Sequence, residues 1–349
     1  MKVVIVTDAW EPQVNGVVRT LKATRHELLR LGHQVEVISP AGFATLPCPG
    51  YSEIRLSVLP GRRLSRLLHA ALDHDGDIAV HIATEGPLGM AARRFCLRRR
   101  IPYTTAYHTR FPQYLRAMFG IPERWTYALM RRFHAPAEVV MAPTPSVEQE
   151  LRSIGLERVG RWSRGVDSDL FRPREPLALN LTKPVFAYVG RVSVEKNVED
   201  FLRLDLPGSK VVAGQGPALD ALKRRYPQVT FLGVLPGDEL ARLYSAADVF
   251  VFPSRTDTFG LVLLEALACG LPIAAYPVQG PLDVVGESDV AVLDEDLRRA
   301  ALAALQIDRA RCRAFAWRRS WPAATREFLS LLRPATLRRG QITSAAAAD

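Results

Sequence analysis

Short runs of consecutive apolar residues alternate along the chain with longer segments in which apolar residues recur at helical spacing. The first 40 residues show the pattern, with apolar runs at 3–6 and 35–38 and one apolar helical face over 17–31. Runs without polar alternation are typical of strands that are buried on both faces of a parallel sheet. The sequence therefore predicts βαβ units and a doubly wound α/β architecture.

The same alternation continues in two series, separated by residues 173–183. This segment is polar, contains prolines and has no clear period, so it is predicted to be an interdomain linker. In the first series we expect strands at 78–82, 102–107 and 139–142 and helices at 86–99 and 146–151. In the second we expect strands at 185–189, 210–213, 229–232, 249–252 and 273–276, and helices ending at 226 or spanning 238–245 and 260–268.

The two series predict two doubly wound halves with a cleft between them. A length of 349 residues agrees with about two domains of roughly 150 residues. We predict an N-terminal domain at 1–172, a C-terminal domain at 184–315, a C-terminal helix at 316–333 that returns to the N-terminal domain, and a frayed tail at 338–349.

Composition excludes several classes of protein. Apolar residues make up 48% and charged residues 23%, which excludes wholesale disorder and collagen-like repeats. No apolar stretch approaches the roughly 18 residues of a transmembrane helix, and Asp8 and Glu11 interrupt the N-terminal run, so neither a membrane span nor a signal peptide is expected. The four cysteines form no C-x-x-C pair, which argues against zinc and disulfide frameworks and indicates a reducing cytosol.

The net charge of +10 lies mainly in the first half of the chain. Residues 1–172 carry 24 Lys and Arg against 16 Asp and Glu, and the excess gathers at 61–66 and 93–100. The positive electrostatic field of these residues would attract an anionic partner, whether a membrane surface, a nucleic acid or a phosphorylated ligand. The alternative is that these arginines form solvated helix faces. A nucleic-acid-binding protein would add base-reading or aromatic motifs, and we find none.

Two carboxylates mark the helix predicted at 260–268. Asp257 lies just before it and Glu265 lies inside it, eight positions on, or roughly 10 Å at about 1.5 Å per residue. Because the helix follows a strand, its first N–H groups face the sheet edge where doubly wound folds bind ligands, and they favour phosphate. A nucleotide sugar, with hydroxyls at each end and a diphosphate between, spans such a gap. The alternative is a helix cap at Asp257 and an exposed residue at Glu265.

Three further segments follow predicted strands and are candidates for the same site. Arg191 and Lys196 lie five positions apart in one loop, where they either converge on a diphosphate or are solvated. Asn15 and Gly16 form the turn into the first helix, and Gly16 either offers N–H groups to a phosphate or acceptor or simply begins the helix. His108 ends a strand and is either a site residue or a satisfied structural histidine.

Two other motifs resemble known ligand-binding patterns but are not expected to bind the ligands of those patterns. Asp167-Ser168-Asp169 matches the D-x-D pattern of metal-dependent sugar transferases, but its place near the domain crossover predicts a turn and helix cap, and no metal site is expected. Gly214 and Gly216 lie in a segment that is too short for a dinucleotide motif and lacks the P-loop lysine. We expect this segment to wall a nucleotide pocket.

Taken together, these segments resemble family 4 of the retaining glycosyltransferases, from residue 1 to about residue 333. Their order and spacing carry the resemblance, since each motif is weak alone. The resembling segments are 12–17, 81–87, 107–109, 161–167, 190–191 with 195–196, 214–217 and the carboxylate pair. The chain is most similar to bacterial GDP-mannose-dependent α-mannosyltransferases and related glycolipid synthases. This implies the GT-B fold, with two Rossmann-like domains that face a central cleft.

The resemblance implies that the domain at 184–315 binds the nucleotide sugar. Glu265 matches the glutamate that bonds the ribose hydroxyls, and Arg191 and Lys196 match the cations on the diphosphate. Asp257 takes the place of the carboxylate that holds the donor sugar's hydroxyls. The family usually has Glu there, so the shorter Asp257 leaves the donor's identity open.

The resemblance also implies that the domain at 1–172 binds the acceptor. Gly16, beside Asn15, matches the glycine loop at the donor phosphates and acceptor, and His108 matches the histidine beside the donor sugar. Backbone N–H groups that would contact sugar or phosphate belong to Phe259, Gly260 and Leu261.

The resemblance thus implies a retaining, metal-independent hexosyltransferase that needs no cofactor, since the nucleotide sugar is its substrate. The expected donor is GDP-mannose and the acceptor is a lipid, a lipid-linked sugar or a glycan. The alternatives are a UDP-sugar-dependent glucosyl or glucuronosyl glycolipid synthase, a nucleotide-sugar epimerase and a nucleic-acid-binding protein. The transferase is expected in the cytoplasm, peripherally on the inner face of the plasma membrane, without a nucleic-acid partner.

Overall fold

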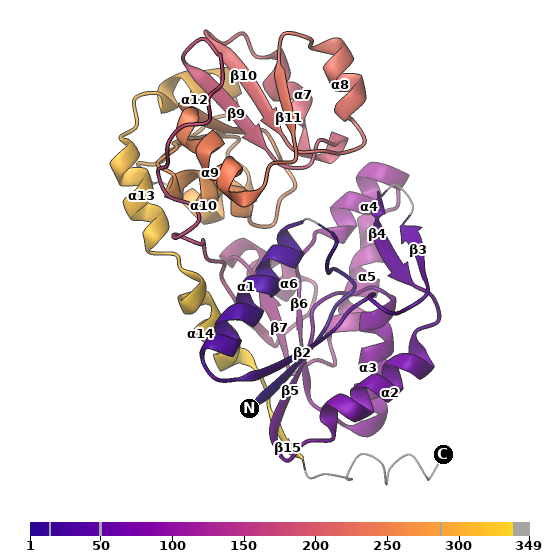
Figure 1. The fold of residues 1–349 in the computed structure, drawn as a ribbon. Coiled ribbons are helices and arrows are strands. Elements are labelled where there is room, and N and C mark those ends of the chain that lie inside the picture. Colours follow the sequence, from indigo (N-terminus) through magenta and orange to yellow (C-terminus); the bar gives the residue numbers. More distant parts are fainter. Residues whose placement is uncertain (14, 49–50, 287, 338–349) are drawn as a thin grey trace. The chain divides into compact units, whose positions relative to one another are not determined.

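The computed structural model describes residues 1–13, 15–48, 51–286 and 288–337, and the chain divides into two compact units (Figure 1). Unit 1 comprises Met1–Ser163 together with the segment from Ala324 onward, and unit 2 comprises Arg164–Ala323. The tail predicted at 338–349 lies outside the described residues.

Unit 1 is built on a sheet of order β2-β1-β5-β6-β7-β8. These strands are parallel, and β15 adds to β5 in the antiparallel direction. The described elements are β1 (Lys2–Val6), α1 (Gly16–Arg30), β2 (Gln34–Ile38), β3 (Thr45–Cys48), β4 (Tyr51–Ser57), α2 (Gly61–Leu72), β5 (Gly76–Ile82), α3 (Pro87–Arg99), β6 (Tyr103–Ala106), α4 (Phe111–Phe119), α5 (Glu123–His134), β7 (Val139–Ala142), α6 (Pro145–Ser153), β8 (Val159–Arg161) and β15 (Ala335–Leu337).

Unit 2 has a second sheet, of order β11-β10-β9-β12-β13-β14, whose strands are all parallel. The described elements from its start are β9 (Val185–Val189), η1 (Val194–Lys196), α7 (Val198–Arg203), β10 (Ser209–Ala213), α8 (Leu219–Arg225), β11 (Thr230–Gly233), α9 (Gly237–Ala246), β12 (Val249–Phe252), α10 (Leu261–Ala268), β13 (Ile273–Ala275), α11 (Gln279–Val285), β14 (Ala291–Leu293), α12 (Leu297–Ala304), α13 (Arg309–Trp317) and α14 (Trp321–Leu331), which continues into unit 1. Two parallel, helix-covered sheets confirm the predicted α/β, doubly wound fold class.

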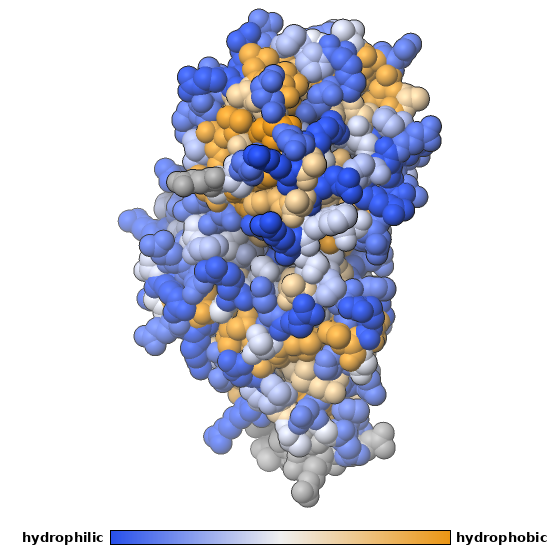
Figure 2. Space-filling model, turned by 90° about the vertical axis from the view of Figure 1, so that its left-hand side faces the viewer, coloured by the Kyte–Doolittle hydropathy of each residue, from blue (hydrophilic) through white to orange (hydrophobic). Residues whose placement is uncertain are grey.

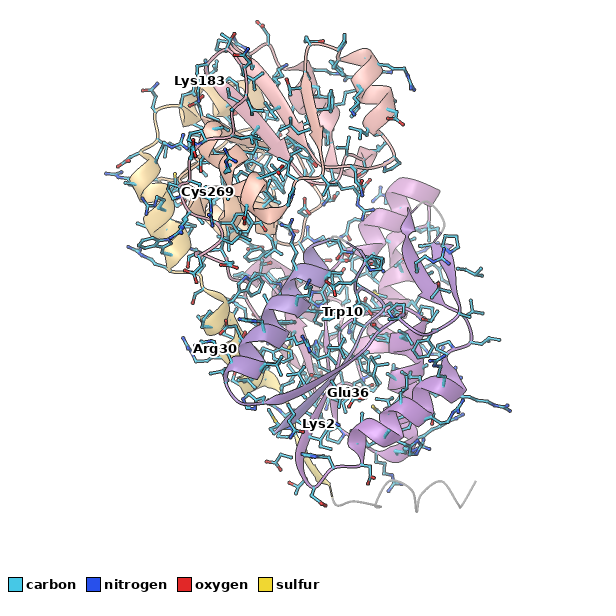
Figure 3. The ribbon with its side chains drawn as sticks, viewed as in Figure 1. Lys2, Trp10, Arg30, Glu36, Lys183 and Cys269 are labelled. Atoms are coloured by element: carbon cyan, nitrogen blue, oxygen red, sulfur yellow. The ribbon has the colours of Figure 1, made fainter. Side chains whose placement is uncertain are left out.

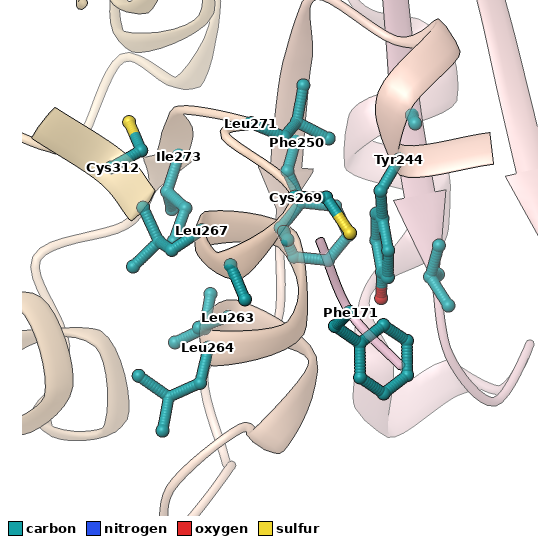
Figure 4. Packing of buried hydrophobic residues seen from close by; sticks show 14 of the residues in the cluster. Phe171, Tyr244, Phe250, Leu263, Leu264, Leu267, Cys269, Leu271, Ile273 and Cys312 are labelled. Atoms are coloured by element: carbon teal, nitrogen blue, oxygen red, sulfur yellow. The ribbon is translucent and has the colours of Figure 1, made fainter. Parts of the chain in front are cut away.

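The central strands are buried on both faces, as their uninterrupted apolar runs predict. All four side chains of Val3–Val6 in β1 are fully buried, and helices cover both faces of the sheet. At the start of β1, Lys2 pairs with Glu36 of the neighbouring strand at 2.9 Å (Figure 3). In unit 2, apolar side chains of α9, α10 and β12 form the larger core, part of which is drawn in Figure 4.

The units divide earlier in the chain than the predicted linker. Residues 173–183 contain no helix or strand, but Leu177, Leu179 and Leu181 pack against the core of unit 2. The backbone N–H of Leu177 donates to the carbonyl of Arg242 at 3.1 Å. Apolar side chains at alternate positions therefore fix this polar-looking segment on unit 2, and the division falls between Ser163 and Arg164.

The C-terminal segment was predicted to return to the N-terminal domain over residues 316–333, but it belongs to unit 1 only from Ala324 onward, and residues 316–323 belong to unit 2. Phe328 of α14 and Leu332 are buried in one cluster with Val3, Ile5 and Trp162. The segment spans the end of α13 as well as α14, so the single predicted helix is two. Beyond it, β15 pairs with β5 (Ala335 opposite Ile78), which the sequence analysis did not anticipate.

The surface carries both polar and apolar side chains. Polar residues predominate on the face drawn in Figure 2, and apolar residues lie between them in patches. Scattered apolar surface is ordinary for a folded protein. Within the described ranges, no helix has the length and apolarity that crossing a bilayer requires.

Candidate functional site

The sheet of unit 2 reverses its winding at β9. The chain runs from β9 outward to β10 and β11, then returns to β12 on the other side of β9 and continues to β13 and β14. The loops after β9 and β12 therefore leave the sheet at its topological switch point, where parallel sheets bind ligands. Arg191 and Lys196 lie in and just beyond the first loop, and Asp257 lies in the second.

An ion pair joins these two loops at the switch point. The ammonium of Lys196 bonds to Oδ1 of Asp257, and both side chains are less than one-fifth exposed. Nearby, the hydroxyl of Thr256 donates to the carbonyl of Glu195 at 3.1 Å, and the amide of Asn197 donates to the carbonyl of Pro253 at 3.3 Å. The structure thus brings two predicted site residues, 61 positions apart, into contact.

Asp257 is available for more than this ion pair. Its second oxygen, Oδ2, is buried and accepts no hydrogen bond from the described part of the chain. The alternative reading of Asp257 as a helix cap is wrong, because Gly260, which has no side chain to cap the helix, occupies the N-cap position of α10. A carboxylate oxygen in this position can accept a hydrogen bond from a hydroxyl group of a ligand.

The start of α10 is suited to an anion. Gly260 has φ of 82°, a left-handed conformation that glycine adopts without strain, and its neighbours Phe259 and Leu261 complete the turn into the helix. The first turn of α10 contains no acidic residue. Its leading N–H groups and the helix dipole therefore favour a negatively charged group such as phosphate.

Glu265 is buried inside α10 and is not the exposed residue of the alternative reading. Only 6% of it is exposed, and the hydroxyl of Tyr244 donates to its Oε2 at 3.5 Å. Tyr244 packs beside Phe171, Phe250 and Cys269 in the core (Figure 4). Burial, with the Glu265 carboxylate nearby, raises the pKa of the Cys269 thiol to about 12. A carboxylate held this deeply is costly unless it serves hydrogen bonds.

Gly214 and Gly216 hold the loop of Arg191 in place. A Cβ atom on Gly214 would lie 1.8 Å from the carbonyl oxygen of Gly190, and one on Gly216 would lie 2.3 Å from that of Val192. The N–H of Val192 donates to the carbonyl of Gln215 at 2.9 Å. The two loops therefore interlock backbone against backbone, which gives the glycines a packing role. Their predicted role as the wall of a nucleotide pocket stays a prediction.

In unit 1 a side chain of the protein itself occupies the equivalent helix start. Asp8, directly beyond β1, accepts hydrogen bonds from the backbone N–H of Leu88 (2.9 Å) and Gly89 (3.2 Å) in the first turn of α3 and from the hydroxyl of Thr84 (2.9 Å). Burial raises the pKa of Asp8 above its ordinary value of 3.8, against the lowering effect of these bonds. This contact was not predicted from the sequence, in which its only signal is a carboxylate that follows a strand.

Asn15 and Gly16 lie at the beginning of α1. The side-chain oxygen of Asn15 accepts from the N–H of Val18 at 3.0 Å, so Asn15 is the N-cap and Gly16 is the first residue of the helix. This geometry agrees with the reading of the segment as a helix start. The role of Gly16 at a phosphate or acceptor stays a prediction.

His108 follows β6 and is partly exposed. Its ring contacts the ring of Trp162 edge-on, with centroids 5.6 Å apart. Trp162 is fully buried and packs on Phe328 of α14 at 4.8 Å. The C-terminal helix thus supports the tryptophan against which His108 rests.

The D-x-D motif is a turn, as predicted, but the predicted helix cap is wrong. Oδ1 of Asp167 accepts from the N–H groups of Asp169 and Leu170, at 3.1 and 3.0 Å, and no helix follows it directly. In the ranges that the structure describes, no three His, Cys, Asp or Glu side chains are grouped as a metal site would require.

Two protein-family models together match most of the chain. The model described as Glycosyltransferase Family 4 matches residues 14–170, and the model described as Glycosyl transferases group 1 matches residues 171–310.

Three curated relatives show the range of similar proteins. A GDP-mannose-dependent alpha-mannosyltransferase of Mycobacterium tuberculosis is 32% identical over 94% of this chain and 95% of its own length. The sulfoquinovosyl transferase SQD2 of Arabidopsis thaliana is 30% identical over 70% of this chain and 51% of its own. An alpha-monoglucosyldiacylglycerol synthase of Streptococcus pneumoniae is 27% identical over 79% and 71%.

Solved structures show the same fold at low sequence identity. Sucrose-phosphate synthase from Thermosynechococcus elongatus aligns with a TM-score of 0.69 at 20% identity, over 95% of this chain and 98% of that one. Anabaena Alr3699/HepE, solved in complex with UDP and glucose, aligns with a TM-score of 0.68 at 14% identity, over 95% and 98%. The two Rossmann-like units are therefore those of the GT-B fold.

Proposed function

Because the chain belongs to glycosyltransferase family 4, we propose that it transfers a hexose from a nucleoside diphosphate sugar to an acceptor hydroxyl. The observation that carries this proposal is the switch point of unit 2, where the Lys196–Asp257 ion pair lies between the loop of Arg191 and the start of α10, whose N-cap is a glycine. Cations, a carboxylate and the N–H groups of a helix start at one sheet edge match the diphosphate and hydroxyls of such a donor.

Each residue of this site has a proposed part in holding the donor. Arg191, Lys196 and the leading N–H groups of α10 neutralise the diphosphate, and Oδ2 of Asp257 accepts a hydroxyl of the sugar. Glu265 accepts the ribose hydroxyls, for which its burial supplies a reason: a desolvated carboxylate forms strong charge-assisted bonds. On the side of unit 1, we propose His108 beside the sugar and Asn15 and Gly16 at the phosphates and acceptor.

We propose that the reaction retains the anomeric configuration and needs no metal. The acceptor oxygen bonds to the anomeric carbon on the face that the diphosphate leaves, the bond from that carbon to the diphosphate oxygen breaks, and the acceptor proton passes to the leaving phosphate. The protein positions the reactants and stabilises the growing charge on the diphosphate through Arg191 and Lys196. Turnover that stops in a chelator and returns with a divalent ion would contradict this mechanism.

GDP-mannose is the proposed donor, because the relative that matches nearly the whole chain is named for it. A UDP-sugar is the second candidate, favoured by the relative named as a glucosyldiacylglycerol synthase and by the shorter carboxylate of Asp257. The same relative supports a lipid acceptor. We therefore also propose a cytoplasmic protein that associates peripherally with an anionic membrane surface through the basic residues of unit 1.

Release of the nucleoside diphosphate tests the proposed reaction. With GDP-mannose or UDP-glucose as donor and a membrane lipid extract as acceptor source, we expect rapid release of GDP or UDP only when donor and extract are both present. Release without acceptor would indicate hydrolysis or epimerisation of the donor. Equal inactivity with every donor, in the presence of extract, would contradict sugar transfer.

A further inference from the structure

A cavity of about 410 Å³ lies on unit 1 between α3 and α5, and its lining includes none of the candidate site residues. Four arginines contribute to its lining: Arg93, Arg94, Arg98 and Arg132. Its lining includes no carboxylate, and none of the four forms an ion pair within the described part of the chain. Four like charges around one cavity repel one another, so an anion bound there would be strongly favoured.

The Arg93 side chain fixes one wall of the cavity through hydrogen bonds to the backbone of α5. Arg93 is half-buried, and its Nε and Nη2 donate to the last carbonyls of α5, those of Phe133 at 3.0 Å and Arg132 at 2.8 Å. These two bonds cap the C-terminal end of α5 and join it to α3. Arg94, Arg98 and Arg132 are exposed and remain able to bind a ligand.

Apolar side chains share the cavity with the arginines. Met90, Leu97 and Leu129 line it and are 41–47% exposed, while Phe133 is buried beneath. On α5, Trp125 precedes Leu129 by four positions and is 64% exposed. Positions three and four apart share one helix face, so Trp125, Leu129 and Arg132 form a single mixed stripe.

This combination favours an amphiphile over a soluble anion. Inorganic phosphate would satisfy the arginines but leave the exposed Met90, Leu97 and Leu129 in water. An anionic lipid satisfies both, because its headgroup binds the guanidinium groups while the apolar side chains and Trp125 enter the interfacial layer, where tryptophan is favoured. This combination of arginines and apolar side chains thus matches the chemistry of an acidic membrane surface.

We propose that this α3–α5 cavity binds the phosphate headgroup of an anionic glycerophospholipid. Arg94, Arg98 and Arg132 bind the phosphate, and Met90, Leu97 and Leu129 contact the acyl region. The proposal deepens the membrane association proposed above by giving it a defined site, and it does not depend on which sugar is transferred.

Vesicle binding of the full chain tests the site. The probes are vesicles of phosphatidylcholine alone and of phosphatidylcholine mixed with phosphatidylglycerol, in cosedimentation at about 0.1 M salt. The test variant replaces Arg94, Arg98 and Arg132 by Gln, and the matched control replaces the exposed Arg62, Arg63 and Arg66 of α2 by Gln, with the same change in charge. We expect the wild type to bind only the mixed vesicles, with at least a tenfold loss in the test variant and about threefold or less in the control.

A second variant tests the contribution of the apolar side chains that line the cavity. Leu97→Gln with Leu129→Gln leaves every charge in place, and both side chains are already exposed, so the fold should be kept. We expect this variant to lose binding by a factor that does not fall as salt is raised, in contrast to the arginine variant.

Three results would overturn the proposal. Equal losses in the two arginine variants would indicate a diffuse positive field, and no loss in either would place binding elsewhere. Binding of a single-stranded RNA, but not of vesicles, that depends on the same three arginines would assign the cavity to nucleic acid. Calorimetric binding of GDP and UDP, measured in parallel, should be unchanged in all variants, so failure of this site is distinguishable from failure of the proposed donor site.

Discussion

Among single residues, Lys196 and Asp257 are both proposed ligands of the donor, yet without it they bind each other. A diphosphate must therefore compete with the Asp257 carboxylate for the Lys196 ammonium. A sugar hydroxyl, in contrast, can bond Oδ2 of Asp257 without disturbing the pair, because that oxygen has no partner within the described residues. The ion pair should therefore weaken binding of the nucleoside diphosphate without hindering the contact between Asp257 and the sugar.

Replacing Asp257 by Asn should separate these two effects. We expect loss of sugar transfer, because the sugar loses its carboxylate, but about fivefold tighter binding of the bare nucleoside diphosphate, because Lys196 is released from a pair worth up to about 1 kcal/mol. Calorimetry with GDP and UDP measures the second effect. Asp289→Asn, which removes an exposed ion pair with Arg311, is the matched control and should change neither property. Unchanged or weaker nucleotide binding in Asp257→Asn would contradict the competition.

Glu265→Gln should weaken donor binding at least tenfold with the fold intact. The amide has the same shape and can still accept from Tyr244, but a hydrogen bond to a neutral acceptor is worth about 0.5–1.5 kcal/mol, against about 1.5–3 kcal/mol for a charged one. Donor KM and the melting temperature measure the two properties. Tyr244→Phe, which removes the hydroxyl but keeps the ring in the core, should have a smaller effect on KM. Wild-type KM and kcat in Glu265→Gln would exclude Glu265 from the site.

Among the elements, the loops after β9 and β10 depend on close backbone packing. In Gly214→Ala the new Cβ would lie 1.8 Å from a backbone oxygen, and φ at this position is 140°, so we expect a loss of at least about 2 kcal/mol in unfolding free energy. Gly233→Ala is a matched control, since φ is 70° but nothing lies within 4 Å of the Cβ, and it should cost about 1–2 kcal/mol. Chemical denaturation compares them. An equal cost in both would refute the interlocking of the loops.

The Asp8 carboxyl at the start of α3 should make the unfolding free energy depend on pH. Because burial raises the pKa of Asp8 above 3.8, the folded chain keeps this proton to higher pH than the unfolded chain does. The stability that Asp8 contributes is therefore fully present below about pH 4 and is lost as pH rises through the raised pKa. The unfolding free energy of the wild type minus that of Asp8→Asn, which does not titrate, should fall over this range. A difference that is constant or rises with pH would show that Asp8 is not destabilised by burial.

The elements that sequence patterns predicted are those with uninterrupted apolar runs. Residues 139–142, 185–189 and 249–252 form strands with the predicted bounds. In contrast, the helix α2 was not predicted, and its first residues were interpreted as a cluster of charge. Its arginines interrupt the apolar pattern in the sequence, although one face of the helix is buried. The buried residues are Leu64, Leu68, Ala71 and Leu72. The antiparallel hairpin of β3 and β4, which lies outside the doubly wound repeat, was also missed, as were the helices α4 and α5 between the parallel strands β6 and β7.

The candidate site was predictable in part for the same reason. Arg191, Lys196 and Asp257 follow strands, so their place at one sheet edge could be inferred from the chain alone. The contact between Lys196 and Asp257 could not, because it depends on β12 returning beside β9 after two intervening strands. The bonds of Asp8 to the start of α3, 80 positions on, depend likewise on the crossover from β1 to β5.

Over the whole molecule, two similar units differ in the state of one helix start. In unit 1 the carboxylate of Asp8 occupies the start of α3, whereas in unit 2 the N-cap of α10 is a glycine, which has no side chain to cap the helix. Most of the net positive charge lies in the first half of the chain, and four of its arginines line the cavity between α3 and α5. We therefore expect the nucleotide to bind unit 2 and a different anionic partner to bind the basic surface of unit 1.

Calorimetric titration of nucleotide sugars tests the central claim, that the switch point of unit 2 binds the donor. With GDP-mannose and UDP-glucose in separate titrations, we expect the wild type to bind one of them, GDP-mannose in the first instance. Each of Arg191→Ala and Lys196→Ala should weaken that binding by about tenfold or more, since each removes a charge-assisted contact to the diphosphate. Arg311→Ala, on a surface helix of the same unit, is the control and should bind as the wild type does. Binding that is unaffected by Arg191→Ala and Lys196→Ala would place the donor elsewhere and contradict the account.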